Sequence, residues 1–240
     1  MPNPSATILA IETATSACSV ALSHGDLIFQ QAQVGNNIHS QVLLTMVQEV
    51  LAQASIVICD IDAVAVGQGP GSFTGLRIGV GVAQGLAYGV NCPMIGVSSL
   101  DALAHQANLD GHVIAAIDAR MGEIYCCQYR NVEGQLQRLN GLEVLKPAVV
   151  NATANQSTDV FLVGNGWSEY WQEFDVELLQ HATHLEKVVY PSAVSILHLA
   201  QSKYRAKETV CAADFAPEYV RNDVAKKAAE KKWKLKQLSS

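Results

Sequence analysis

The chain has 240 residues, of which 49% are hydrophobic and 16% are charged, and its formal net charge is −6. This length and apolar content suffice for a sizeable core, in one large domain or two small ones. The acidic balance argues against a general nucleic-acid binder, because phosphate backbones favour basic surfaces. The charge is uneven, since a tail from Val224 to Ser240 holds six lysines and a single glutamate.

The cysteines and the first residues indicate a cytoplasmic protein. The six cysteines show no C-x-x-C pair and lie mostly among apolar neighbours, which is typical of buried, reduced thiols. Residues 1–5 lack the basic region of a signal peptide. A run of about 18 apolar residues, long enough to cross a membrane, is also missing from the sequence. We therefore expect a soluble, cytoplasmic protein with no membrane partner.

Three strands and a helix open the chain. Apolar runs at residues 7–12, 17–23 and 27–34 are separated by turn residues, which predicts a β-meander. From residue 39 to residue 54 apolar side chains recur at helical spacing, which predicts an amphipathic helix of about four turns.

The rest of the chain is organised around residues 62–90. This stretch begins as an apolar strand, passes through a glycine-rich turn at residues 67–72 and continues as a proline-free helix with little side-chain bulk. A helical glycine costs roughly 0.5–1 kcal/mol relative to alanine, so several together indicate close approach of another backbone. The strand, turn and helix N-terminus also suit anion binding, although a tight turn before a small-residue core helix would give the same pattern. A strand at residues 94–97 and a helix capped by Ser98 or Ser99 complete the order βββαβαβα.

The second half repeats this pattern in reduced form. An apolar run that ends in an acid at residues 113–118 parallels residues 9–12, and DVFLVGNG at residues 159–166 parallels DAVAVGQG at residues 62–69. These two matches indicate a structural duplication. The other expected elements are strands at 123–130 and 135–145, a weak helix at 147–154, a helix at 167–174, a brief strand at 187–190 and a helix at 191–203.

We expect three regions along the chain. Residues 1–108 form an N-terminal lobe that binds the partner. Residues 109–223 form a reduced C-terminal lobe, whose last helices pack back on the first lobe. Residues 224–240 form a disordered, lysine-rich tail.

Duplicated α/β halves of this kind resemble the superfamily of acetate and sugar kinases, Hsp70 and actin, in which two ribonuclease H-like lobes face each other across a nucleotide cleft. Within it, four runs resemble the bacterial TsaB (YeaZ) family, and the resemblance covers nearly the whole chain. These runs are ILAIETAT at 8–15, HSQVLL at 39–44, GPGSFTGLRIG at 69–79 and DARMGEIY at 118–125.

The resemblance implies an accessory subunit rather than an enzyme. Its partner would be TsaD, which transfers a threonylcarbamoyl group to adenosine 37 of tRNA, with the ATPase TsaE as a third member. TsaD-type proteins bind a metal through H-x-x-x-H on the first helix, but here His39 is followed by Leu43 at the second position. We therefore expect no catalytic residue, no metal and no cofactor, although a nucleotide could bind where the chain assembles with TsaD and TsaE.

The first two helices are the predicted interface with TsaD or with a second copy of the chain. The first helix has a wide apolar arc, and the second has the small residues that allow close approach. The alternative is that both helices pack only on their own sheet. The interface residues are His39, Val42, Leu43, Met46, Val47, Val50, Gly75, Leu76, Gly79, Ala83 and Leu86.

A second group of residues is predicted to contact an anion or a nucleotide. These residues are Glu12, Thr13, Gly69, Gly71, Ser72, Asp118 and Arg120. Glu12 and Asp118 end strands where kinases of this fold hold magnesium, but both could simply be capping or solvated carboxylates. The glycine turn lacks the lysine of a P-loop. Arg120 is the strongest candidate, as a contact to a nucleotide phosphate or to a partner carboxylate.

Other functions remain open at this point. A small-molecule kinase of the same fold would need a catalytic acid at Glu12 or Asp118. A metallopeptidase would need a complete metal site, and His181 and His184 are more simply explained as surface histidines. A homodimer could sense a nucleotide. The lysine-rich tail is either a solubilising end or a salt-sensitive arm that contacts tRNA phosphates.

Overall fold

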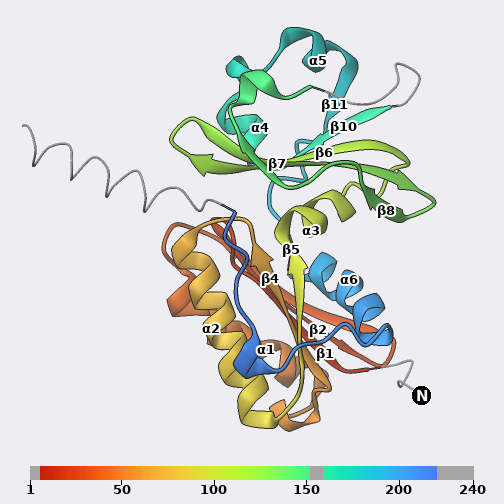
Figure 1. Ribbon diagram of the computed structural model, residues 1–240. Helices are drawn as coiled ribbons and strands as arrows, with labels where there is room; N and C mark the ends of the chain where they lie inside the picture. The colour runs from red at the N-terminus through yellow and green to blue at the C-terminus, as the bar shows by residue number, and fades with distance from the viewer. Residues whose placement is uncertain (1–5, 152–158, 221–240) are drawn as a thin grey trace, which may run out of the picture.

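The computed structural model describes residues 6–151 and 159–220, which form two stacked α/β lobes (Figure 1). The lysine-rich tail from Val224 to Ser240, which was predicted to be disordered, lies outside the described residues. Within those two ranges, no helix has the length and apolarity that a membrane-spanning segment needs.

The first lobe has the predicted order βββαβαβα. Its five strands form one sheet in the order β3-β2-β1-β4-β5, in which β1 pairs antiparallel with β2 and parallel with β4. The strands are β1 (Ile8–Glu12), β2 (Ala17–His24), β3 (Leu27–Val34), β4 (Ala63–Gly69) and β5 (Met94–Ser98). The helices are α1 (His39–Ala54), α2 (Phe73–Val90) and α3 (Ser99–His105).

The second lobe repeats this topology, which confirms the duplicated fold of the actin, Hsp70 and sugar-kinase kind. Its sheet has the order β8-β7-β6-β10-β11, and β9 also pairs with β7. As in the first lobe, the central strand β6 pairs antiparallel with β7 and parallel with β10. The strands are β6 (Gly111–Arg120), β7 (Glu123–Val132), β8 (Gln135–Arg138), β9 (Glu143–Leu145), β10 (Val160–Val163) and β11 (Ala182–His184). Its helices are α4 (Asn165–Glu169) and α5 (Val176–His181). The next helix along the chain, α6 (Ala193–Arg205), packs on the first sheet instead.

The second lobe is reduced in its helices, as predicted, but several element positions differ from the prediction. The weak helix expected at 147–154 is a 3-10 turn at Pro147–Val149, and residues 152–154 lie outside the described residues. The helix expected at 167–174 is α4 followed by the 3-10 turn η3 (Trp171–Glu173). The strand expected at 187–190 was wrong, because Val188 packs on the second-lobe core from a loop, where its carbonyl accepts the Gly164 N–H at 2.8 Å.

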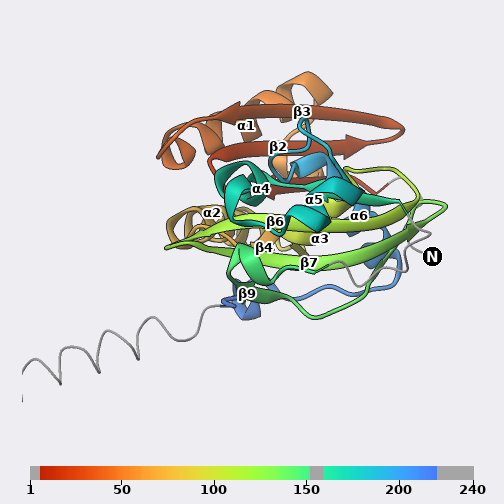
Figure 2. The ribbon, with the colours of Figure 1, turned by 90° about the horizontal axis from the view of Figure 1, so that it is seen from above.

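Both faces of the first sheet are covered by helices. In β1, Leu9 and Ile11 belong to the core formed with α1 and α2, whereas Ile8 and Ala10 belong to the core formed with α6. A strand buried on both faces reads as a continuous apolar run, which explains why β1 and β4 lack polar alternation. In the second lobe, α4 packs against β6 and α5 against β11, and the view from above shows both helices beside β6 (Figure 2).

Helices α3 and α6 lie at the border between the two sheets (Figure 1). Helix α3 contacts β6 of the second lobe, whereas α6, near the end of the described chain, packs against β1, β2 and β5 of the first lobe. Ile196 and Leu197 of α6 are fully buried there. The Ala193 N–H at the start of α6 donates to the Ser19 hydroxyl at 2.9 Å. Each lobe is therefore completed by a helix at the shared border.

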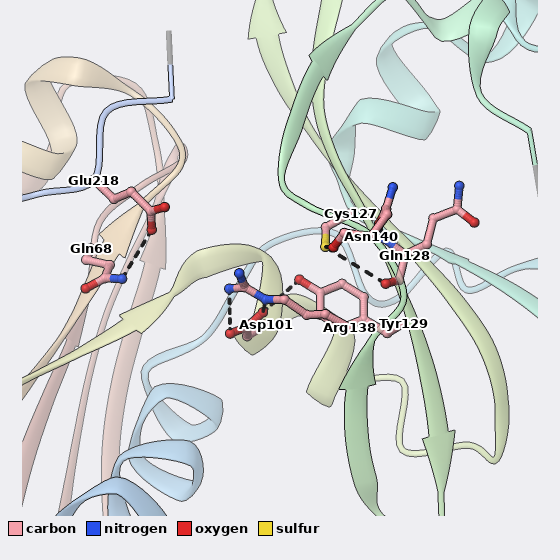
Figure 3. A network of polar contacts seen from close by, with 8 residues as sticks. All are labelled: Gln68, Asp101, Cys127, Gln128, Tyr129, Arg138, Asn140 and Glu218. Carbon is pink, nitrogen blue, oxygen red and sulfur yellow. Dashed lines mark hydrogen bonds and ion pairs between the residues drawn. The ribbon is translucent and has the colours of Figure 1, made fainter. Parts of the chain in front are cut away.

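A polar cluster holds α3 against the second sheet (Figure 3). Arg138 donates from Nε and Nη2 to the two carboxylate oxygens of Asp101, at 2.7 and 2.8 Å. The buried Tyr129 hydroxyl donates to the same carboxylate at 2.8 Å. Burial, with the Asp101 charge beside it, raises the pKa of Tyr129 well above its ordinary value, so the hydroxyl stays a donor. The cluster fixes the orientation of α3 on the second lobe.

Candidate functional site

Three glycines of the glycine-rich stretch face the chain's own β1–β2 turn. We call Gly71, Gly75 and Gly79 the inner glycines. A Cβ added at any of them would overlap Thr13 or Ala14. The two segments are also joined by hydrogen bonds, from the Thr13 hydroxyl to the Gly75 carbonyl at 2.9 Å and from the Ser72 N–H to the Ala14 carbonyl at 2.7 Å. The predicted close approach of a second backbone is therefore confirmed here, and that backbone is the β1–β2 turn.

Three other glycines, all within α2, face outward. Gly81, Gly85 and Gly89 recur every four residues, so they lie along one face of α2, and all three are exposed. A Cβ added at any of them would have no neighbour within 4 Å. We call these residues the outer glycine face. Packing within the described chain gives no reason for glycine at these positions.

The predicted interface residues are mostly part of the chain's own core. Val42 and Leu86 are partly buried, and the other nine are buried. These residues therefore pack on the chain's own sheet, which was the alternative raised by the sequence. The nine buried residues are His39, Leu43, Met46, Val47, Val50, Gly75, Leu76, Gly79 and Ala83. The predicted set leaves out side chains that α1 and α2 do expose, such as Leu44, which widens the apolar arc of α1, and Tyr88. Docking through these helices stays a prediction. Because the predicted residues are buried, a partner would have to contact the exposed face of the two helices instead.

Glu12 is fully buried at the end of β1. Its carboxylate accepts the Ala14 N–H at 2.6 Å and the Ser99 hydroxyl at 2.8 Å, so it joins the β1–β2 turn to the start of α3. Gly67 lies against it, and an added Cβ there would overlap the carboxylate. Burial raises the pKa of Glu12, and these hydrogen bonds oppose the shift without cancelling it. The carboxylate thus acts as a buried cap of its own turn.

We expect the stability of the protein to fall with rising pH because of Glu12. Its folded-state pKa lies above the ordinary 4.5, so its contribution is fully present below pH 4.5 and is lost as pH rises through the folded-state pKa. Glu12→Gln should flatten this part of the curve, while Glu49→Gln on the exposed side of α1 should not. Urea unfolding at several pH values from about 4 to 8 measures both slopes. Identical slopes in Glu12→Gln and the parent would contradict the assignment.

Asp118 and Arg120 lie on the second lobe, at the turn between β6 and β7. The Asp118 carboxylate accepts the Arg120 N–H at 2.7 Å and the Tyr170 hydroxyl at 2.8 Å, and it pairs with the Arg120 guanidinium at 3.1 Å. Burial, with Asp118 beside it, raises the pKa of Tyr170 to about 12. Arg120, Met121 and Gly122 have successive φ values of 64°, 63° and 75°, a left-handed run that is unusual for residues other than glycine. This turn holds the Arg120 side chain 80% exposed.

The glycine turn itself is covered by the C-terminal segment. The Glu218 N–H donates to the Gln68 carbonyl at 2.8 Å, and a Cβ added at Gly69 would come within 2.9 Å of the Glu218 carbonyl. The Ser72 hydroxyl caps α2 by accepting the Gly75 N–H at 3.3 Å. The predicted anion contacts therefore fall into three places. Glu12 and Thr13 lie beneath α2, and Asp118 and Arg120 lie on the other lobe. In the glycine turn, Gly69 lies against Glu218, Gly71 lies against Ala14 and Ser72 is exposed.

The position that would complete a histidine pair on α1 belongs to the core. His39 is 7% exposed and its Nε2 has no hydrogen-bond partner, whereas Leu43 is 1% exposed among apolar side chains. His184 stacks on Trp171, with ring centroids 5.2 Å apart, and His181 ends α5. Across residues 6–151 and 159–220, no three histidine, cysteine, aspartate or glutamate side chains gather into a group that could hold a metal ion.

Comparison with known proteins places the chain in a family. A family model described as TsaD, tRNA N6-adenosine threonylcarbamoyltransferase, matches residues 33–229. The tRNA threonylcarbamoyladenosine biosynthesis protein TsaB of Escherichia coli is 41% identical over 226 residues, which cover 91% of this chain and 96% of that protein. The TsaB protein of Haemophilus influenzae is 37% identical over 233 residues, 91% of this chain and 94% of its own length. The structure of YeaZ from Pseudomonas aeruginosa has a TM-score of 0.81 at 36% identity, covering 90% of this chain and 100% of that one. The chain therefore belongs to the TsaB (YeaZ) family, within the wider family of TsaD-like proteins.

Proposed function

We propose that the chain is a non-catalytic subunit in the formation of N6-threonylcarbamoyladenosine at position 37 of tRNA, and that it acts with TsaD and TsaE. TsaD carries out the transfer in this proposal, and the chain holds TsaD in a competent state. Two lines support the proposal: relatives that cover nearly the whole chain are named tRNA threonylcarbamoyladenosine biosynthesis protein TsaB, and the matching family model is named for the transferase.

The outer glycine face of α2 is the observation that carries the docking part of the proposal. Each glycine inside a helix costs roughly 0.5–1 kcal/mol relative to alanine, so three without an internal reason favour an external one. A partner helix can approach a surface without Cβ atoms much more closely than an ordinary helix surface. The inner glycines show this effect within the chain, where they admit the β1–β2 turn.

The surroundings of the outer glycine face also suit a partner helix. Helices α1 and α2 pack side by side on one face of the first sheet (Figure 1), so their exposed sides form one surface. Leu44 of α1 is 55% exposed and Tyr88 of α2 is 77% exposed, which supplies apolar and aromatic anchors. We expect a second copy of the chain to use the same surface, so that homodimer formation and TsaD binding compete.

Two positions that carry catalytic or metal-binding groups in related proteins, Glu12 and Leu43 here, support a non-catalytic role. Glu12 is fully buried and its carboxylate caps its own turn, which removes it from any substrate between the lobes. Leu43 fills the second metal-ligand position with a buried apolar side chain. Arg120 is left as the residue that we propose to contact a nucleotide phosphate or a TsaD carboxylate in the assembled complex.

A reconstituted modification assay tests the proposal. Purified TsaD and TsaE are incubated with unmodified tRNA, ATP and a threonylcarbamoyl donor, with and without this chain, and the nucleosides are measured by mass spectrometry. The modified nucleoside should accumulate only when the chain is present, and the chain alone should form none. Full modification in its absence, or product formation by the isolated chain, would overturn the proposal.

A further inference from the structure

Residues of η3 and α5 on the second lobe line a shallow hollow. Helix α5 lies on the side of this lobe that faces away from the first lobe (Figure 1). The hollow has a volume of about 450 Å³ and lies between η3 and α5. Its floor is apolar, yet Trp171 remains 39% exposed and Val176 65% exposed. Its lining residues are Trp171, Gln172, Phe174, Val176, Leu179 and Gln180. Exposed apolar side chains that gather around a hollow favour an occupant with an apolar anchor.

The chain around this hollow is strongly acidic. From Asn165 to Glu186 there are five carboxylates and no lysine or arginine. Three of the carboxylates, Glu173, Asp175 and Glu177, alternate with lining residues along the chain and are exposed. Burial lowers the pKa of His184, which stacks on Trp171, so this imidazole adds no positive charge at neutral pH. Such a rim repels RNA phosphates and attracts a cationic segment.

The chain carries a segment of the complementary composition. Residues 224–240 hold six lysines and one acid, and Trp233 and Leu235 lie among the lysines. We propose that the hollow binds this lysine-rich tail of the same chain, with Trp233 against Trp171 and Val176 and the lysines facing the carboxylates. The tail is thus cationic and carries an aromatic anchor, which complements the acidic rim and the apolar floor of the hollow.

Tethering makes the tail of the same chain the favoured occupant. Val220, the last described residue, packs on the core between α3 and the second sheet. Glu218 and Tyr219 just before it contact Gln68 and Arg77 of the first lobe, so the tail starts at the border between the two lobes. An extended segment from Val220 to Trp233 spans about 45 Å, whereas a domain of this size has a radius of gyration of about 17 Å. A linker of this kind gives an effective concentration of about a millimolar, so even a weak site is substantially occupied. Because the attraction is electrostatic, occupancy falls as salt rises.

Zero-length carbodiimide cross-linking of the full-length chain tests this proposal. The reagent joins a lysine to a carboxylate only when they touch, and mass spectrometry locates the joined residues. At low ionic strength, lysines 226 to 236 should join to Glu173, Asp175 or Glu177 within one chain, and the yield should fall several-fold at about 1 M salt. Glu173→Lys with Glu177→Lys should abolish these products. Adding Lys231→Glu and Lys232→Glu should restore cross-links, now between the new lysines of the rim and the new glutamates of the tail.

Trp233 supplies a second readout, and a charge-matched variant supplies the control. The fluorescence of Trp233 is obtained as the difference between the parent and Trp233→Phe. In the parent it should be blue-shifted and protected from quenching by iodide. In the double variant Glu173→Lys with Glu177→Lys it should be red-shifted and quenched. The control pair Asp26→Lys with Glu49→Lys makes the same change in net charge on the first lobe and should leave both readouts unchanged. Three results would overturn the proposal: cross-links spread over other carboxylates, cross-links only between two chains, or Trp233 emission that is the same in the parent and in Glu173→Lys with Glu177→Lys.

Discussion

Replacing Gly85 by leucine is expected to abolish co-elution of the chain with purified TsaD while leaving the chain folded. Gly85 lies in the middle of the outer glycine face, and an added side chain meets nothing within the chain. Leucine should even favour the helix by roughly 0.5–1 kcal/mol. In the complex, the same side chain would separate two closely packed helices, and overpacking of about 2–3 kcal/mol weakens binding about a hundredfold. Size-exclusion chromatography and calorimetric titration measure the loss.

Gly141→Leu is the matched control for this experiment. Gly141 is on the second lobe, and an added Cβ there also has no neighbour within 4 Å. Its substitution should leave both stability and TsaD binding unchanged. If Gly85→Leu bound TsaD as tightly as Gly141→Leu does, the outer glycine face would not be the docking surface.

Replacing Gly79 by leucine, in contrast, is expected to unfold the first lobe rather than to disturb docking alone. The added Cβ would overlap the Thr13 side chain, whose hydroxyl is fixed by its hydrogen bond to the Gly75 carbonyl. Because Thr13 is fully buried, the turn has no space into which it can move. We expect a loss of more than about 3 kcal/mol in the free energy of unfolding, above what most single substitutions cause, because the clash lies in the core.

Urea unfolding measures this loss, and the milder Gly79→Ala allows the comparison if the leucine variant is insoluble. Gly81→Leu, two residues along the same helix, is the control and should retain full stability. Equal stabilities of Gly79→Leu and Gly81→Leu would contradict the division of α2 into an inner and an outer face. The sequence analysis placed Gly79 in the partner interface, so a leucine there would have been read as a test of binding. In the structure the same change tests the stability of the first lobe.

The first lobe could be predicted from the sequence almost completely, because its strands and helices are long and their apolar periodicity is strong. The misplaced elements are short and set by tertiary contacts. Strand β11 has three residues, none of them buried, so its sequence carries little signal. The apolar Val188, which suggested a strand, is explained by packing from a loop.

The candidate site could be predicted only in part. Within α2, Gly75 and Gly79 are offset by two residues from the series Gly81, Gly85 and Gly89, which places the two groups on opposite faces, and this spacing is visible in the sequence. Which face meets the β1–β2 turn depends on tertiary packing, so the inner glycines could not be assigned to the chain's own core. The positive φ values of Arg120 and Met121 had no sequence signal either, since neither residue type favours that conformation.

The packing of α6 against the first sheet has a consequence for biosynthesis. The strands of that sheet emerge from the ribosome long before residues 193–205, which cover one of its faces. Until then Ile8, Ala10 and Ile95 present a bare apolar surface to solvent. A nascent chain that stalls before α6 would be a client for chaperones, and a fragment ending at residue 108 would aggregate unless α6 were supplied as a separate peptide.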